Sequence, residues 1–520
     1  MEHWKSRPGE SKAHVQNSVG RMILVGVSLI IQIAWIVGTA MRLTEYYAAI
    51  QIVLSLLAFI LVLHICDRPI NSAYKITWIV TILIFPLFGI LIYLMFGHHN
   101  VLFFTRQKFL HLQDVLTTSL IRDPEKLEQL RAQDPVLGGQ AYYLQQVAGY
   151  PLYQNTDVTF YGDTLEAIRA QQDALRKAER FIFMEYHAIE DTPGWREIED
   201  ILAEKAAAGL DVRVFYDDVG SVGFINGSFR RRLIKKGIQC QAFNPIVPVI
   251  NVFMNHRDHR KITVVDGKVG FTGGYNLADE YFNVTHPYGQ WKDSGLKLEG
   301  DGVRSMTAIF LEMWDATRKT REDFEPFLKP FPYTVREPDG YVAPYADSPL
   351  DDELTGENVY LNLIKGATRY LYITTPYLII SDEMARELSL AAQRGVDVKL
   401  ITPGIPDKKV IYRITRSHYA DLIRHGVQIY EYTPGFLHQK EFVSDDRVAV
   451  VGTINLDFRS LYLHFENACW FTGYEAVVQV RKDIEEILKV CRKGEPHRKE
   501  RDSAFQRFTR LLLKLLSPLL

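Results

Sequence analysis

The chain has 520 residues, of which 47% are hydrophobic and 23% charged, and these proportions exclude a largely disordered, collagenous or coiled-coil protein. Sixty Lys and Arg against 62 Asp and Glu give a net charge of −2, without the basic excess that is typical of nucleic-acid-binding proteins. Four cysteines, far apart and without a C-x-x-C pair, exclude a disulfide scaffold and a zinc site built on paired cysteines.

Three apolar runs lead the chain and predict a membrane region over residues 1–100. The runs at 22–41, 46–65 and 76–97 contain no Asp, Glu, Lys or Arg. Each is long enough for a helix to cross the hydrocarbon core of a bilayer, which takes about 20 residues. A signal peptide and a buried soluble bundle are weaker alternatives, because further runs follow the first one and the runs show almost no polar face.

The number of spans and the side of the membrane stay open. Residues 42–45 make a very short turn, so two spans with one shallow hairpin arm compete with three spans. The distribution of Lys and Arg residues around the runs favours, by a small margin, a catalytic part on the external side of the membrane. We expect a multi-pass protein of the cell membrane, with a juxtamembrane connector at 101–150.

The rest of the chain contains an internal repeat. Glycine ends each predicted helix and the same strand pattern follows in both copies, with Gly209–Val214 matching Gly395–Leu400 and Gly237–Gln239 matching Gly426–Gln428. Each copy predicts the order strand, helix, strand, helix, strand. This alternation indicates two α/β halves with a largely parallel sheet.

Domain boundaries follow from the repeat. We expect the halves at 151–330 and 351–490, joined by a proline-containing linker at 331–350. A tail at 491–520 carries eight basic and three acidic residues between positions 492 and 514, with leucines interleaved near its end. We expect an amphipathic segment on an anionic membrane surface, a helix packed on the catalytic domain, or both.

A motif of the form H-x-K-x4-D-x6-G-x2-N occurs once in each half. The copies begin at His259 and His438, and the offset is 179 residues at every matched position. Lysine brings a point charge to phosphoryl oxygens, asparagine brings amide donors, and histidine can attack phosphorus or transfer a proton. Two copies face to face would put two histidines on opposite sides of one phosphodiester, so we predict a single site shared by the halves.

Metal-dependent chemistry has little support in the sequence. The patterns H-E-x-x-H and G-x-x-x-x-G-K-[ST] are absent, as is a dense carboxylate cluster, so we expect no metal and no cofactor. Asp217 and Asp218 resemble a metal-binding pair, but we expect a solvated strand end. Tyr377, at the end of a predicted strand, is either a substrate contact or an ordinary packing residue.

The paired motifs resemble those of the phospholipase D superfamily, over roughly residues 150–490, and a closer resemblance to bacterial cardiolipin synthases extends over nearly the whole chain. Asn255–Lys261 with Gly273–Asn276 resembles the first motif of these synthases, and Gly452–Ser460 resembles the second. Lys75–Trp78 and Phe85–Gly89 resemble the membrane segment of these synthases, and Ser517–Leu520 resembles their usual ending.

The resemblance implies transfer of a phosphatidyl group between two phosphatidylglycerol molecules, giving cardiolipin and glycerol through a phosphohistidine, without a metal. It implies that His259 is the nucleophile and that His438 acts as acid and then as base. The residues implied to bind the phosphate are Lys261, Lys440, Asn276 and Asn455. The residues implied to orient the two histidines are Asp293 and Glu466. The aspartates that complete the predicted catalytic motifs are Asp266 and Asp445, which we expect to support structure rather than perform chemistry.

Departures from the family pattern concern the edges of the site. Thr453 stands where serine is commoner, Gln439 and Glu441 make the second motif more polar, and His464 stands where asparagine is expected.

We expect phospholipids and the bilayer as partners, and no nucleic acid; the oligomeric state stays open. The alternatives are a membrane-anchored phospholipase D that hydrolyses, a nuclease of the same superfamily and a lipid-binding scaffold. Two intact motif cores disfavour the scaffold, and near-neutral charge disfavours the nuclease.

Overall fold

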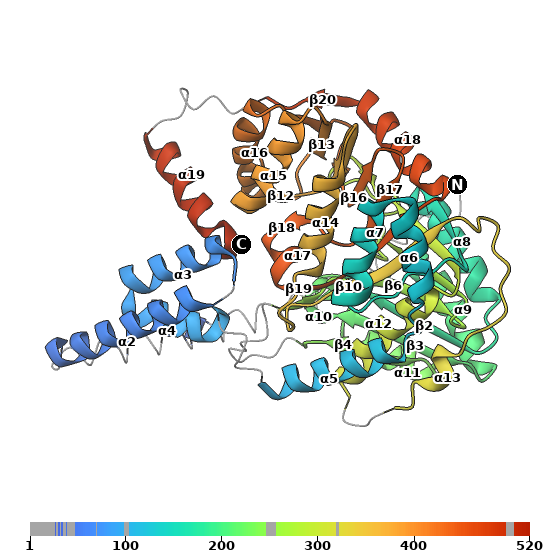
Figure 1. Ribbon diagram of the computed structural model, residues 1–520. Helices are drawn as coiled ribbons and strands as arrows, with labels where there is room; N and C mark the ends of the chain where they lie inside the picture. The colour runs from blue at the N-terminus through green and yellow to red at the C-terminus, as the bar shows by residue number, and fades with distance from the viewer. Residues whose placement is uncertain are drawn as a thin grey trace.

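A computed structural model describes residues 47–68, 70–97, 103–245, 256–318, 322–495 and 504–519, and isolated positions between 27 and 38. Two α/β halves form the main body, and a group of N-terminal helices projects from one side of it (Figure 1). This arrangement confirms the two predicted halves. Most of the apolar run at 22–41 lies outside the described residues.

The first half is built on a seven-stranded sheet with the order β1-β9-β7-β6-β2-β3-β4. Strands β2, β3 and β4 are parallel, whereas the remaining neighbours pair antiparallel. The strands are β1 (Thr156–Tyr161), β2 (Phe181–Tyr186), β3 (Asp211–Asp217), β4 (Gln239–Phe243), β6 (Lys261–Val265), β7 (Val269–Gly273) and β9 (Gly295–Gly300). The helices around it are α8 (Thr164–Arg176), α9 (Pro193–Ala207), α10 (Asp218–Ser221), α11 (Gly227–Lys235), α12 (Val303–Ala316) and α13 (Glu325–Leu328).

The second half repeats this order as β10-β19-β17-β16-β11-β13-β14 and adds β20 at the end. Its strands are β10 (Tyr341–Asp347), β11 (Tyr370–Thr374), β13 (Asp397–Pro403), β14 (Gln428–Tyr432), β16 (Glu441–Ser444), β17 (Val448–Gly452), β19 (His464–Thr472) and β20 (Cys491–Lys493). Its helices are α14 (Thr355–Gly366), α15 (Asp382–Gln393), α16 (Lys409–Arg424), α17 (Phe458–Tyr462) and α18 (Glu475–Lys489). Four short strands lie between or beside the sheets: β5 (Arg257–Asp258), β8 (Gln290–Lys292), β12 (Leu378–Ile379) and β15 (Gly435–Leu437).

The prediction of a largely parallel sheet is wrong for the strands that carry the motifs. Strand β6 pairs antiparallel with β2 and with β7, and β16 pairs antiparallel with β11 and with β17. The reason is the tight connection between β6 and β7, where Asp266 and Gly267 have φ values of 57° and 70°. Such a turn reverses the chain and produces a hairpin, whereas a parallel pair needs a long crossover.

Strand β10 lies inside the range predicted as a linker, 331–350, so that prediction is wrong in its second part. The strand pairs with β19 from Tyr341 opposite Thr472 to Asp347 opposite Glu466. Proline in this strand is tolerated because β10 ends the sheet, where backbone N–H groups are not all needed by a neighbouring strand.

The N-terminal helices pack on one another beside the second half. They are α2 (Tyr47–Asp67), α3 (Ser72–Ile84), α4 (Pro86–Ile92) and the π-helical turn η2 (Tyr93–Gly97). Pro86 begins α4 and interrupts the helix at Phe85, so the run predicted at 76–97 is not one continuous helix. Among the described residues, no helix combines the length and the apolar character that a membrane crossing requires.

A small core joins these helices to the second half and to the C-terminal helix α19 (Ala504–Leu516). Tyr74 packs edge-on against Phe458 and Tyr462, with ring centroids 5.5 and 5.6 Å apart. Thr77 of α3 donates to the carbonyl of Leu515 at 2.7 Å. Figure 1 shows α19 reaching back from the second half to α3. The predicted tail is therefore a packed helix at this end of the molecule.

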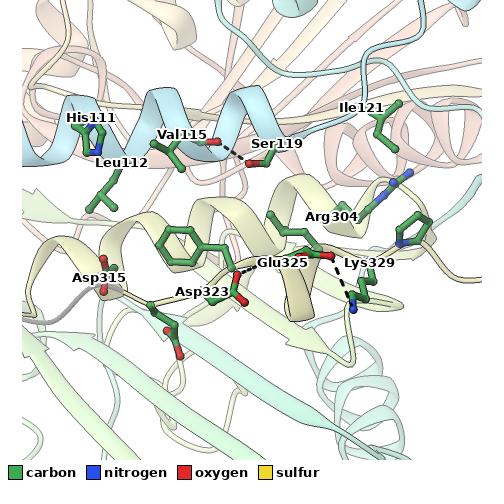
Figure 2. Close-up of a pocket in the computed structure, with 14 residues that line it drawn as sticks. His111, Leu112, Val115, Ser119, Ile121, Arg304, Asp315, Asp323, Glu325 and Lys329 are labelled. Carbon is green, nitrogen blue, oxygen red and sulfur yellow. Dashed lines mark hydrogen bonds and ion pairs between the residues drawn. The ribbon is translucent and has the colours of Figure 1, made fainter.

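The connector at 101–150 is helical and begins with α5 (Phe103–Ser119), which lies along α12. The helices that follow it are α6 (Pro124–Gln133) and α7 (Pro135–Tyr142). A cavity of about 510 Å³ lies between α5, α12 and α13, and Figure 2 shows its mixed lining, including the Lys329–Glu325 ion pair at 3.9 Å. No residue of either motif lines this cavity.

Candidate active site

Two short strand pairs cross between the halves and hold the motif histidines. Strand β5, directly before His259, runs parallel to the start of β19, and β15, directly before His438, runs parallel to β8. The backbone N–H of His259 donates to the carbonyl of Phe465, and that of His438 donates to the carbonyl of Lys292, both at 2.8 Å. Each half therefore seats its histidine against a strand of the other half.

Two buried carboxylates complete the crossed arrangement. Nδ1 of His259 lies 2.9 Å from both carboxylate oxygens of Glu466, and Nδ1 of His438 lies 2.7 Å from Oδ2 of Asp293. A carboxylate accepts the Nδ1 proton, so Nε2 of each neutral imidazole keeps a free lone pair. Each histidine comes from one half and its acid from the other, which brings all four residues together in one buried site.

The residue that touches the acid differs between the halves. A Cβ atom at Gly274 would lie 2.0 Å from Oδ1 of Asp293, so glycine is needed for the close approach of this carboxylate. At the matching position Thr453 donates its hydroxyl to Oε2 of Glu466 at 2.5 Å and accepts from the N–H of Asn467 at 2.9 Å. The hydroxyl at this departure from the family pattern therefore helps to fix the acid.

The motif lysines are buried beside the histidines. Nζ of Lys261 donates to the carbonyl of His259 at 2.6 Å, while Nζ of Lys440 donates to the carbonyl of His438 and lies 2.8 Å from its Nδ1. Burial lowers the pKa of Lys261 to about 8 and that of Lys440 to about 7. At neutral pH the charge of Lys261 is therefore mostly present and that of Lys440 about half present, and both decline above it.

Both histidines are neutral at pH 7 in this state of the site. Burial, followed by the charge of the neighbouring motif lysine, lowers the pKa of His259 well below its usual value and that of His438 to about 4. Burial alone would raise the pKa of Asp293, but the facing His438 and Lys440 hold it below its usual range. Asp293 is thus ionised behind the neutral imidazole of His438, and His259 is neutral, which is the form a nitrogen nucleophile needs.

The motif asparagines are also buried in the site. Oδ1 of Asn276 accepts from the N–H of Ala188 at 3.1 Å, and its Nδ2 donates to the hydroxyl of Tyr281 at 2.7 Å. Oδ1 of Asn455 has no hydrogen-bond partner within the part of the chain that the structure describes. Each amide group carries two N–H donors, and the contact with Tyr281 uses one of those of Asn276.

The motif aspartates lie at the other end of the motif strands and do not belong to the catalytic set. Asp266 follows β6, whereas His259 precedes it, and its carboxylate accepts from the backbone N–H groups of Glu179, Arg180 and Phe181 at 2.7–2.9 Å. Asp445 accepts in the same way from the backbone N–H groups of Thr368, Arg369 and Tyr370, where β11 begins, at 2.8 Å. Both carboxylates fix the entry of a central strand.

The prediction that Asp217 is a solvated strand end is wrong. Its side chain is fully buried, caps α10 through the N–H groups of Val219 and Gly220 at 2.9 Å, and accepts from the N–H of Asp258 at 3.0 Å. Burial raises its pKa to about 6. Asp217 therefore holds the residue next to His259, a role that only the fold brings to light.

The two histidines have different surroundings. His438 lies among aromatic rings, with centroids of Tyr281 and Trp291 at 5.3 and 5.2 Å. His259 lies between two further histidines, with the rings of His187 at 4.9 Å and His464 at 5.5 Å. Trp291 and His464 each stand two residues before an orienting acid, a spacing visible in the sequence.

Asn467 and Tyr377 are two further side chains near the site. Asn467, which the sequence analysis missed, joins the halves by accepting from Lys261 N at 3.2 Å and donating to Thr272 Oγ1 at 2.7 Å. Tyr377 is half-buried, and its hydroxyl donates to Asp407 at 2.6 Å. Its ring centroid lies 6.3 Å from that of Phe436. A substrate contact by Tyr377 stays a prediction.

Comparison with protein families identifies both halves and the N-terminal region. The model described as "Cardiolipin synthase, PLD-like domain" matches residues 172–314 and 360–488. The model described as "Phospholipase_D-nuclease N-terminal" matches residues 53–98. The first match covers more than half of the chain. It includes every residue of the two motifs, and also Asp293 and Glu466.

Similar proteins span nearly the same length. An uncharacterized protein of Streptococcus mutans is 41% identical over 88% of this chain and 99% of its own. A cardiolipin synthase of Halalkalibacterium halodurans is 32% identical over 86% of this chain and 88% of its own. Among solved structures, a phosphatidylserine synthase of Haemophilus influenzae matches with a TM-score of 0.57 at 16% identity, over 72% of this chain and 98% of its own, which is a likeness of fold.

Proposed function

Because the chain belongs to the cardiolipin synthase family of PLD-like proteins and is a phosphatidyltransferase, we propose that it joins two phosphatidylglycerol molecules into cardiolipin and releases glycerol. The observation that carries the proposal is the crossed pair of histidine–carboxylate contacts, at 2.9 Å for His259 and 2.7 Å for His438. This arrangement supplies one nucleophile and one proton donor to a single phosphodiester.

In the first step, Nε2 of His259 attacks phosphorus and a phosphorus–nitrogen bond forms. The bond from phosphorus to the glycerol oxygen breaks, and His438 gives its Nε2 proton to that oxygen. Glu466 stabilises the positive charge that develops on His259, as the acid of a catalytic triad does. Lys261, Lys440 and the two motif asparagines bind the non-bridging oxygens.

Substrate binding prepares His438 for this step. Without substrate, burial and the Lys440 charge keep its pKa at about 4. A phosphodiester anion next to the imidazole favours the protonated form and opposes the lysine charges, so the pKa of His438 rises when the lipid binds. In the second step the neutral His438 takes a proton from the glycerol hydroxyl of a second phosphatidylglycerol, whose oxygen displaces His259 from phosphorus.

We also propose that the chain acts at the bilayer, as a multi-pass protein of the cell membrane, with phospholipids as its substrates. Large apolar side chains of the N-terminal helices are exposed, and a soluble monomer rarely exposes so many in one place. They include Ile52, Leu56, Phe59, Ile60, Leu63, Ile84 and Phe85. Phe508 and Leu511 of α19 are exposed on the helix that packs against α3. A lipid surface would cover these side chains and supply the second lipid at high local density.

One assay tests the proposal. Purified full-length protein is mixed with vesicles of phosphatidylglycerol labelled in the head group and in an acyl chain. We expect cardiolipin and free glycerol in equal amounts with little phosphatidic acid, and added glycerol should drive the reaction backward, because the leaving group is also an acceptor. If phosphatidic acid dominates at every lipid density and glycerol fails to reverse the reaction, the protein is a hydrolase.

A further inference from the structure

His464 lies beside the nucleophile, with its ring 5.5 Å from that of His259, and the proposed reaction leaves it without a role. It is the first residue of β19 and stands two positions before Glu466, on the same face of the strand. Neither of its ring nitrogens makes a hydrogen bond to any residue that the structure describes, and both are buried. A buried nitrogen lone pair without a donor is costly unless another group binds it.

His464 shares a small volume with two other donors. One ligand atom each from His259, His464 and Glu466 all lie within 4.8 Å of one another. His259 Nδ1 lies 2.9 Å from Oε1 of Glu466, and His464 Nδ1 lies 3.6 Å from the same oxygen. Tetrahedral Zn²⁺ with bonds of about 2.0–2.1 Å needs ligand atoms ~3.3 Å apart, and these two separations lie on either side of that value.

We propose that His259, His464 and Glu466 form an inhibitory site for Zn²⁺ or a similar divalent transition metal. Two imidazoles and one carboxylate are the donor set of many zinc sites with an open fourth position. Mg²⁺ and Ca²⁺ prefer oxygen ligands, so they should not compete. The site differs from that of a metal-dependent enzyme, because the metal occupies the nucleophile itself.

Inhibition follows from the single proton of a neutral imidazole. In the free site that proton is on Nδ1 of His259 and points at Glu466, which leaves the Nε2 lone pair for phosphorus. A metal bound at Nδ1 takes the Nδ1 lone pair, so the proton moves to Nε2 of the same ring and the charge of the ring does not change. With Nε2 protonated, the attacking lone pair is gone. This step rests on the proposed function, whereas metal binding does not.

The test uses full-length protein purified without a polyhistidine tag and reconstituted in nanodiscs. Co²⁺ binding is followed by its visible absorption, and Zn²⁺ inhibition is expressed relative to the metal-free activity of each variant. His464→Asn should weaken Co²⁺ binding and Zn²⁺ inhibition by more than about 100-fold, because loss of a residue that only orients a ligand already costs about 10–100-fold. The matched control is His187→Asn, which replaces the other histidine beside His259 and should leave both quantities unchanged.

Each outcome decides the inference. Equal metal sensitivity in His464→Asn and the unsubstituted protein overturns it, as does an equal loss in His187→Asn. Should His464→Asn fold poorly by thermal melting, His464→Gln serves as a second variant with the same expectation. Co²⁺ binding that depends on His464 in a protein that makes no cardiolipin would retain the metal site and reject the proposed function. Cardiolipin formation without Zn²⁺ sensitivity would do the reverse.

Discussion

Replacing Asp293 by asparagine separates the roles of the two histidines. Asp293 is 1% exposed and accepts the Nδ1 proton of His438 at 2.7 Å, and its charge opposes the fall in the pKa of His438 that burial and Lys440 cause. Asparagine keeps the shape and removes the charge. The same change in a Ser-His-Asp triad costs about 10⁴-fold, so we expect cardiolipin formation to fall by about 10³–10⁴-fold, or about 4–5.5 kcal/mol.

A phosphatidyl ester of p-nitrophenol makes the assay specific for one step. Nitrophenolate leaves without needing a proton, so formation of the phosphohistidine no longer depends on His438. Asp293→Asn should therefore keep the rapid burst of nitrophenolate while it loses cardiolipin synthesis. Glu466→Gln, which removes the carboxylate behind His259, should lose both. Asp173→Asn, the same change at an exposed ion pair, is the control and should change neither.

The opposite pattern would refute this reasoning. If Glu466→Gln keeps the burst and Asp293→Asn loses it, His438 is the nucleophile and His259 is the acid. Burst amplitudes that fall in both variants by the same factor would mean that the carboxylates act on the site as a whole rather than each on its own histidine. Rapid quenching at several times gives the amplitude and the rate separately.

Four further predictions follow from the same contacts. His259→Ala and His438→Ala should each abolish net synthesis, and the double variant should lose little more; two half-active singles would contradict a shared site. Exhaustive EDTA treatment should leave activity intact, and a loss that a divalent cation restores would count against the mechanism. Raising the pH through about 7–8 removes the charges of Lys440 and Lys261, so KM for phosphatidylglycerol should rise, less so in Lys440→Arg, which stays charged. Asp445→Ala should destabilise the fold by about 2–4 kcal/mol, because three backbone N–H groups lose their acceptor; thermal melting checks this, with Asp173→Ala at an exposed ion pair as the control.

The repeat and the motifs could be read from the sequence because they are local and periodic. Glycine after each helix and the constant offset of 179 residues predict two α/β halves. The antiparallel motif strands could not be read in this way, because their order depends on the turn at Asp266 and Gly267, where both φ values are positive. Pro344 is typical of a linker, and only the position of β10 at the end of the sheet makes it compatible with a strand.

The sequence also could not predict that each acid contacts the histidine of the other half. Nothing in the spacing of Asp293 and Glu466 says that each serves the histidine of the other half, and the resemblance supplied the residues without this pairing. Asp217 shows the same limit, since an acid at a strand end is usually solvated and this one is buried beside Asp258. Both features arise where chain segments distant in sequence meet, so the structure had to supply them.

The crossed contacts make catalysis sensitive to the interface between the halves. Both histidine–acid contacts and both backbone bonds, from His259 to Phe465 and from His438 to Lys292, join one half to the other. A separation of about 1 Å would lengthen all four beyond hydrogen-bond distance, even with each sheet intact. Misplacement of this size costs about 10²-fold in rate when reacting groups must be aligned. When the halves move apart, activity should therefore fall more steeply than the stability of either half. The site behaves as one unit although two repeats build it.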